Sequence, residues 1–116
     1  MADKYCLGSV TFGSPDVLLD TPFKSGSITL TNSIFNYNFI MFVYDYGTTN
    51  NQVQTQTYYI GKNKNNIRKD SVYFAIVWGN SSTSSFQTMY VNDNGTVLTV
   101  NNRAGNTRLM RIYGFL

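Results

Sequence analysis

Two unbroken apolar runs dominate the pattern of hydrophobic and polar positions, one over residues 39–44 and one over residues 72–78. A strand with one face in water alternates between apolar and polar residues, so an uninterrupted run is typical of a strand buried on both faces. We therefore predict that these two runs form the centre of a sheet, with the other strands laid around them.

Shorter segments on either side also show strand patterns, and Gly-, Asn- and Pro-rich turns separate them. The strongest hairpin signal is Asp93-Asn94-Gly95, because Asn-Gly tolerates the positive φ of a tight turn. The pattern predicts an all-β fold: one domain over residues 1–116, an antiparallel β-sandwich of eight or nine short strands, in jelly-roll or another order. Besides the two apolar runs, the predicted strands are 5–12, 17–19, 27–31, 53–60, 86–90, 97–100 and 107–113.

The composition supports the all-β assignment and constrains the surface. The chain has no Glu and no His, and only 13% of its residues are charged, against roughly 25% in average soluble domains. The surface must then consist largely of Asn, Thr, Ser, Gln and Tyr, as is common in proteins that bind sugars or other copies of themselves. The apolar residues 109–116 predict that the last strand is central or packs against another subunit.

Several function classes lose support from the same composition. Without His, the chain lacks the common base for Ser and Cys nucleophiles and the commonest transition-metal ligand. Cys6 alone cannot form a zinc site, and Asp-rich calcium-loop spacing is absent, so we expect no enzyme activity, metal or cofactor. No apolar run approaches the roughly 18 residues that span a bilayer, so we expect no membrane insertion. The net charge of +3 is thinly spread, which argues against nucleic acid as a partner.

Two stretches resemble a known family. Residues 26–44, Gly-Ser-Ile-Thr-Leu-Thr-Asn-Ser-Ile-Phe-Asn-Tyr-Asn-Phe-Ile-Met-Phe-Val-Tyr, resemble a segment of the carboxy-terminal domains of bacteriophage tail-fibre and minor structural proteins. Residues 109–114, Leu-Met-Arg-Ile-Tyr-Gly, resemble the close of those chains. Together the stretches cover under a quarter of the sequence, and Asn38 stands where Asp is more usual. The resemblance implies a trimeric β-sandwich head that recognises the bacterial surface, often a glycan.

Sugar binding needs flat apolar faces for the ring CH groups, and amides or carboxylates for the hydroxyls. For Trp78 the alternative is core packing, since aromatic residues in an apolar strand are usually buried. Tyr58 and Tyr59 point to opposite faces, which predicts that one of them is exposed or at an interface. The candidate ligand-binding residues are Tyr44, Asp45, Tyr46, Tyr58, Tyr59, Trp78, Asn80 and Tyr90.

The loop 61–70 carries a basic cluster that could bind phosphate, as in teichoic acid or lipopolysaccharide core. The alternatives are a solvated hairpin tip and, beside stacking aromatic residues, a single-stranded nucleic-acid site. The cluster consists of Lys62, Lys64, Arg68 and Lys69.

We therefore expect a non-catalytic domain at the tip of a phage tail fibre, on the virion and outside the host cell. It would bind a bacterial cell-surface polysaccharide as a homotrimer, whose three shallow sites gain affinity through effective concentration. One alternative is a virion structural, trimerisation or head-decoration module without glycan binding. Another is a monomeric secreted carbohydrate-binding module, which would usually carry a signal peptide, a pattern not seen at the amino terminus.

Overall fold

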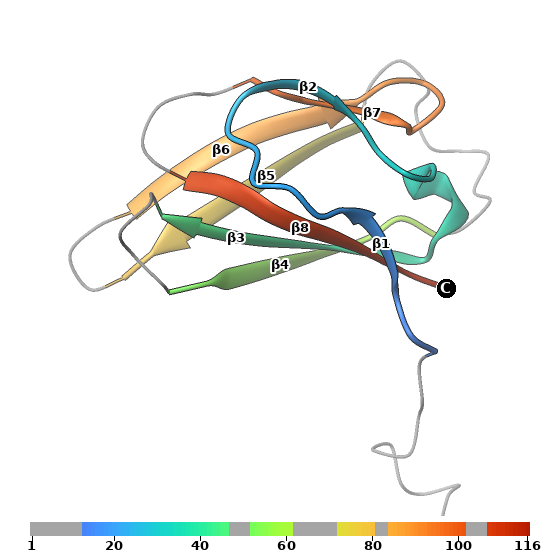
Figure 1. The fold of residues 1–116 in the computed structure, drawn as a ribbon, viewed down its shortest axis with the longest axis horizontal. Helices are drawn as coiled ribbons and strands as arrows, with labels where there is room; N and C mark the ends of the chain where they lie inside the picture. Colours follow the sequence, from blue (N-terminus) through green and yellow to red (C-terminus); the bar gives the residue numbers. More distant parts are fainter. Residues whose placement is uncertain (1–12, 47–51, 62–71, 81–83, 102–106) are drawn as a thin grey trace, which may run out of the picture.

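In the part of the chain that the structure describes, eight strands form two four-stranded antiparallel sheets that pack face to face (Figure 1). The computed structural model describes residues 13–46, 52–61, 72–80, 84–101 and 107–116. The prediction of an antiparallel β-sandwich is confirmed. Sheet A has the order β1 (Asp16–Leu19), β8 (Thr107–Phe115), β3 (Phe39–Tyr46) and β4 (Gln54–Tyr59). Sheet B has the order β2 (Gly26–Thr29), β7 (Val97–Val100), β6 (Ser84–Val91) and β5 (Val72–Gly79).

The strand order combines pairs from opposite ends of the chain with sequential hairpins. β1 pairs with β8 and β2 with β7, as in a jelly roll. The remaining strands depart from that plan, because β3 pairs with its neighbour β4, and β5, β6 and β7 form a meander. Among the described residues, the only helical element is the short 3-10 turn Ile34–Asn36, and no helix is long and apolar enough to cross a membrane.

The core lies between the two sheets and consists of inward-facing strand residues together with residues of the corner before β3. Alternate residues point inward because successive side chains of a strand lie on opposite faces. The largest fully buried side chains are Trp78, Tyr37, Tyr44, Phe42, Leu18, Ile34, Ile40, Ile76, Met89, Leu98, Leu109 and Ile112.

The expectation that both apolar runs form the centre of one sheet and are buried on both faces is wrong. β3 and β5 belong to different sheets, and β5 is an edge strand. Burial alternates in both strands: Phe42 and Phe74 are buried, whereas Met41 is half-buried and Tyr73 is 63% exposed. The runs are unbroken because apolar side chains also occupy the outer faces of the sandwich, and sequence alone does not distinguish an outer apolar face from a second core.

The last described strand is central, which confirms one of the two sequence expectations for the apolar residues 109–116. β8 lies between β1 and β3 in sheet A. Its inward residues Leu109 and Ile112 are 1% and 0% exposed. The edge strand predicted at 17–19 is β1, whereas the strand predicted at 5–12 lies outside the described residues.

The two stretches that resemble phage proteins meet in space. Gly114 pairs with Ile40 across β8 and β3, and the ring of Tyr37 lies against Gly114, where a Cβ would be 2.7 Å from the ring. The Tyr37 hydroxyl donates to Asp16 Oδ2 at 2.7 Å and accepts from Asn32 Nδ2 at 3.1 Å. Tyr37 therefore links the corner before β3 to the neighbouring strands β1 and β8.

The predicted Asn-Gly turn is confirmed between β6 and β7. Gly95 has φ of 71°, a left-handed conformation that glycine adopts without a steric penalty. Its carbonyl accepts from the Ile34 backbone N–H at 3.0 Å, and a Cβ here would lie 2.7 Å from Ser33 Oγ. The turn thus supports the 3-10 corner that precedes β3.

Candidate functional site

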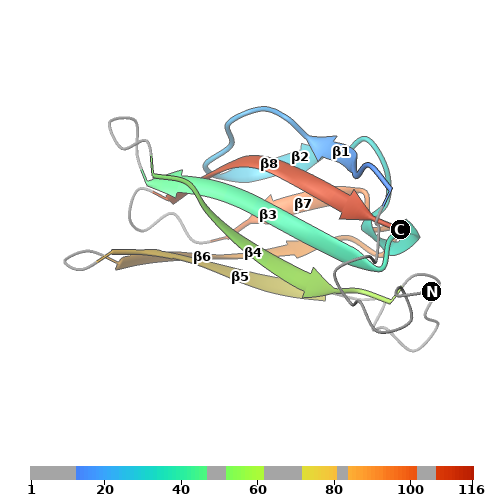
Figure 2. The same ribbon diagram turned by 90° about the horizontal axis from the view of Figure 1, so that it is seen from below.

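The edges of β4 and β5 face each other on one side of the sandwich (Figure 2). Most of the aromatic residues nominated for sugar binding close this side instead. The Tyr44 hydroxyl donates to the Val77 carbonyl at 2.8 Å. The Tyr58 hydroxyl accepts from the Ala75 backbone N–H at 3.0 Å and donates to the Ala75 carbonyl. These side chains from sheet A satisfy backbone groups on the open edge of sheet B. We call this contact region the β4–β5 seam.

Gln54 completes the seam with a side-chain amide that forms the two hydrogen bonds which the backbone of a neighbouring strand would otherwise form. Its Nε2 donates to the Gly79 carbonyl at 2.6 Å, and its Oε1 accepts from the Gly79 N–H at 3.0 Å. An edge strand normally offers unpaired N–H and C=O groups to other chains. Here the side chains of β3 and β4 bind those groups along β5, so this edge is poorly suited to pair with another strand.

Trp78 lies at the end of the seam and is 0% exposed. Its Nε1 donates to the Gln52 carbonyl at 3.0 Å, and the ring of Tyr46 stacks on it at 4.7 Å between centroids and 21° between planes. Trp78 therefore packs in the core, which the sequence analysis gave as the alternative to sugar binding. Tyr44, 2% exposed, is equally unable to offer a ring face to a sugar, and burial raises the pKa of its hydroxyl above the usual value.

Asp45 is engaged by a cation rather than open to a ligand. Its carboxylate accepts from Arg108 Nε at 2.8 Å and from Arg108 Nη2 at 3.1 Å, and the residue is 5% exposed. This two-point hydrogen bond raises the pKa of the guanidinium. The β3–β8 register brings the two residues together, a pairing that sequence reasoning did not identify.

The remaining candidates lie on separate surfaces. Tyr59, 63% exposed, is on the outer face of sheet A and packs edge-on against Phe39 at 5.2 Å between ring centroids. Tyr90 is half-buried on the outer face of sheet B, and Asn80 is exposed just after β5. The structure therefore does not gather the eight candidates into one site. The basic cluster Lys62, Lys64, Arg68 and Lys69 lies outside the described residues.

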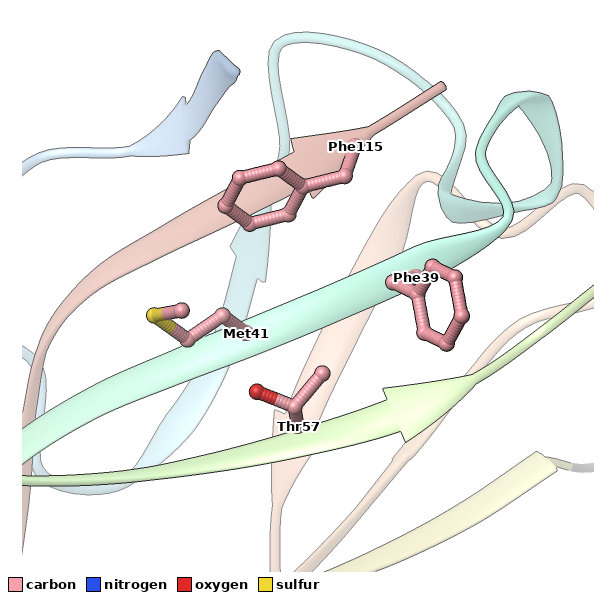
Figure 3. Close-up of a pocket in the computed structure, with 4 residues that line it drawn as sticks. All are labelled: Phe39, Met41, Thr57 and Phe115. Carbon is pink, nitrogen blue, oxygen red and sulfur yellow. The ribbon is translucent and has the colours of Figure 1, made fainter. Parts of the chain in front are cut away.

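The outer face of sheet A carries an apolar hollow that sequence reasoning missed. Figure 3 shows the four side chains around it, standing on β8, β3 and β4, and the hollow has a volume of about 340 Å³. The register aligns the side chains in rows, Phe115 beside Phe39 and Tyr113 beside Met41. The signal was present in the unbroken run 39–44, whose odd-numbered residues form this face. The lining residues are Phe39, Met41, Thr57 and Phe115.

A second hollow of about 330 Å³ continues on the same face, beside a bulge in β8. The register shifts between Val43 and Tyr44, so Met110 and Arg111 both line this hollow. Arg111 Nε donates to Asp20 Oδ1 at 2.7 Å, and its Nη1 donates to the Tyr113 hydroxyl at 2.9 Å. These two hydrogen bonds raise the pKa of the Arg111 guanidinium. They also place polar groups beside the apolar side chains that line the second hollow.

No family model matches the chain, and no curated protein matches its sequence. Within the described ranges, no three His, Cys, Asp or Glu side chains group closely enough to hold a metal ion. The features of the described residues that could contact a partner are the exposed outer faces of the two sheets, including the two hollows on sheet A.

Proposed function

We propose that this domain is the non-catalytic tip domain of a bacteriophage tail fibre, which acts as a homotrimer on the virion and binds a bacterial cell-surface polysaccharide outside the host cell. The observation that carries the proposal is the apolar outer face of sheet A. The resemblance of residues 26–44 and 109–114 to phage fibre domains supports a tail fibre as the biological setting and a trimer as the oligomeric state.

The outer face of sheet A suits contact between copies of the chain. Phe39, Met41, Val43 and Phe115 are only half-buried, although they lie on interior strands of the sheet. Soluble monomers rarely expose contiguous apolar patches of more than a few hundred Å². A second copy would cover the patch, and closed rotational symmetry would use it in every subunit.

Glycan recognition fits the rest of the described surface, which combines polar side chains with exposed aromatic and aliphatic ones and carries few charged residues. The described part of the chain presents Ser, Thr, Asn and Tyr side chains that can exchange hydrogen bonds with sugar hydroxyls. Three weak sites held on one rigid trimer would bind a repeating polysaccharide far more tightly than one site alone, because the second and third contacts form at high effective concentration.

A virion structural module without a ligand is the second candidate. One observation favours it specifically: Tyr44, Tyr58 and Trp78 stabilise the sandwich in the β4–β5 seam instead of facing solvent. Under this alternative the outer face of sheet A still forms the trimer, but no surface binds glycan.

The test is molar mass in solution, by light scattering over a range of protein concentrations. The proposal predicts a mass near three times 13.1 kDa, and a monomer at every concentration would contradict it. Binding of the trimer to immobilised polysaccharides from bacterial envelopes would then separate the two candidates. A trimer that binds none of them would favour the structural module.

A further inference from the structure

The outer face of sheet B contains a row of side chains that crosses all four strands. The register aligns Tyr73 on β5 with Tyr90 on β6, Tyr90 with Thr99 on β7, and Thr99 with Ser27 on β2. Phe74, Met89 and Leu98, which follow or precede these residues along the strands, are buried, and Ile28 packs against the core, so the four side chains point outward. With a spacing of about 4.8 Å between strands, the row is roughly 14 Å long. We call it the Tyr–hydroxyl row.

The two halves of the row differ in chemistry. Tyr73 is 63% exposed and lies 5.6 Å from Tyr90 between ring centroids, so the aromatic half offers ring surface to solvent. The other half consists of hydroxyls, with Ser27 Oγ and Thr99 Oγ1 2.7 Å apart and sharing a hydrogen bond. A sugar ring presents the matching pair of surfaces, with CH groups that pack on aromatic rings and hydroxyls that exchange hydrogen bonds.

The next rows along the strands extend this surface. Ala75 lies beside Thr88, and Asn101 follows Thr88 across the sheet through a backbone hydrogen bond of 2.9 Å. Ala75 and Asn101 are exposed, so a small side chain flanks the aromatic half of the row and an amide flanks the hydroxyl half. A chain of sugars lying across the strands would meet aromatic, hydroxyl and amide groups on one face of the sheet.

The lack of charged side chains on this surface favours a neutral ligand over a charged one. Among the described residues, none of the outward side chains of β2, β5, β6 and β7 is charged. A phosphorylated or uronic-acid polymer would find no counter-ion there, and burying its charge without one is costly. A neutral polymer carries no such cost. The outward side chains considered are Ser27, Thr29, Tyr73, Ala75, Val77, Ser84, Phe86, Thr88, Tyr90, Val97 and Thr99.

We propose that the Tyr–hydroxyl row is the binding site for a neutral, extended polysaccharide, with Tyr73 and Tyr90 packing on its sugar rings and Thr99 and Ser27 binding its hydroxyls. This inference rests on the proposed function and specifies its ligand class and its surface. It places the ligand on sheet B, opposite the face assigned to contact between copies.

The experiment measures affinity of the whole chain for four immobilised probes: fragments of a neutral glucan, a neutral mannan and a neutral galactan, and an oligouronate. We expect binding to at least one neutral probe, without dependence on salt. Tyr73→Ala should weaken that binding about tenfold, because it removes the exposed ring of the pair. Lys24→Ala is the control, since Lys24 is exposed in the segment between β1 and β2, outside both sheets, and its affinity for the neutral probe should stay at the wild-type value.

The possible failures are distinguishable. If the wild type binds a neutral probe and Tyr73→Ala binds equally well, the row is not the site, although the proposed function stands. If only the oligouronate binds, and salt weakens it, the neutral class is overturned. If no probe binds, glycan recognition itself is contradicted. Melting curves of both variants should match the wild type, because both positions are exposed.

Discussion

Gly114 shows how one residue without a side chain fixes the position of another. The ring of Tyr37 occupies the space where a Cβ of residue 114 would lie, 2.7 to 2.8 Å from three ring carbons. Because the Tyr37 hydroxyl is held by Asp16 and Asn32, the ring has little freedom to withdraw. We expect Gly114→Ala to lower the free energy of unfolding by about 2 kcal/mol, as overpacked core substitutions do. Urea unfolding measures this.

Gly13→Ala is the matched control for that substitution. A Cβ at position 13 meets nothing within 4 Å, so the control should leave stability unchanged. If the two variants unfold at the same urea concentration, the contact between Tyr37 and Gly114 does not constrain the fold.

Two buried tyrosines make stability sensitive to alkali. Burial raises the pKa of both Tyr37 and Tyr44, and the hydrogen bond to Asp16 raises that of Tyr37 further. Below about pH 10, the usual tyrosine pKa, their contribution to stability is fully present. As the pH rises past this value the unfolded chain ionises first, so the free energy of unfolding falls until the folded-state pKa is passed.

The double variant Tyr37→Phe and Tyr44→Phe tests this dependence. It should be less stable at neutral pH, because it removes hydrogen bonds worth about 1 kcal/mol each. Its stability should then decline less than that of the wild type between about pH 9 and pH 11. Equal declines, measured by urea unfolding at each pH, would show that other groups cause the alkaline sensitivity.

Residue-scale features were predictable where the cause was local. The turn at Asp93-Asn94-Gly95 follows from the φ that glycine permits, and it is present. The environment of Trp78 and Tyr73 was not predictable, although both lie in one apolar run. One is 0% exposed and the other 63%, because alternation assigns them to opposite faces and the run carries no polar residue to mark which face is outward.

At the scale of elements, Gln54 replaces a missing strand at the edge of β5. Gln54→Ala would leave the Gly79 N–H and C=O without these partners, so we expect a loss of about 1 to 2 kcal/mol in the free energy of unfolding. The exposed edge should also increase aggregation on heating, measured by light scattering. Thr55→Ala is the control, because Thr55 is exposed on the same strand. Equal behaviour of the two variants would mean that the seam does not protect the edge.

The strands themselves were largely predictable, whereas their partners were not. The predicted segment 97–100 is β7, and β3 spans the predicted apolar run. Pairing between β1 and β8 joins opposite ends of the described chain, and local patterns contain no information about such contacts. The same limit explains why Asp45 was nominated as a ligand, since its partner Arg108 is brought to it only by the β3–β8 register.

At the scale of the whole molecule, the two outer faces have different chemistry and, in our proposals, different partners. Met41→Lys places a charge beside the hollow on sheet A, where contact between copies would bury it. We expect this variant to be a monomer by light scattering, and to adhere to bacteria at least tenfold more weakly because avidity is lost. Thr29→Lys, exposed on sheet B, is the control and should remain trimeric. A trimeric Met41→Lys variant would exclude this face from the interface.

The central position of β8 has a consequence for how the protein is made. The four strands of sheet B, together with β1, β3 and β4, are all translated before β8. Until β8 is synthesised, β1 and β3 lack the strand that joins them in sheet A. The inner face of sheet B, with Trp78 and Met89, then has no complete sheet to cover it. This domain must therefore remain free of aggregation until β8 has been synthesised, and the arrival of that strand completes sheet A.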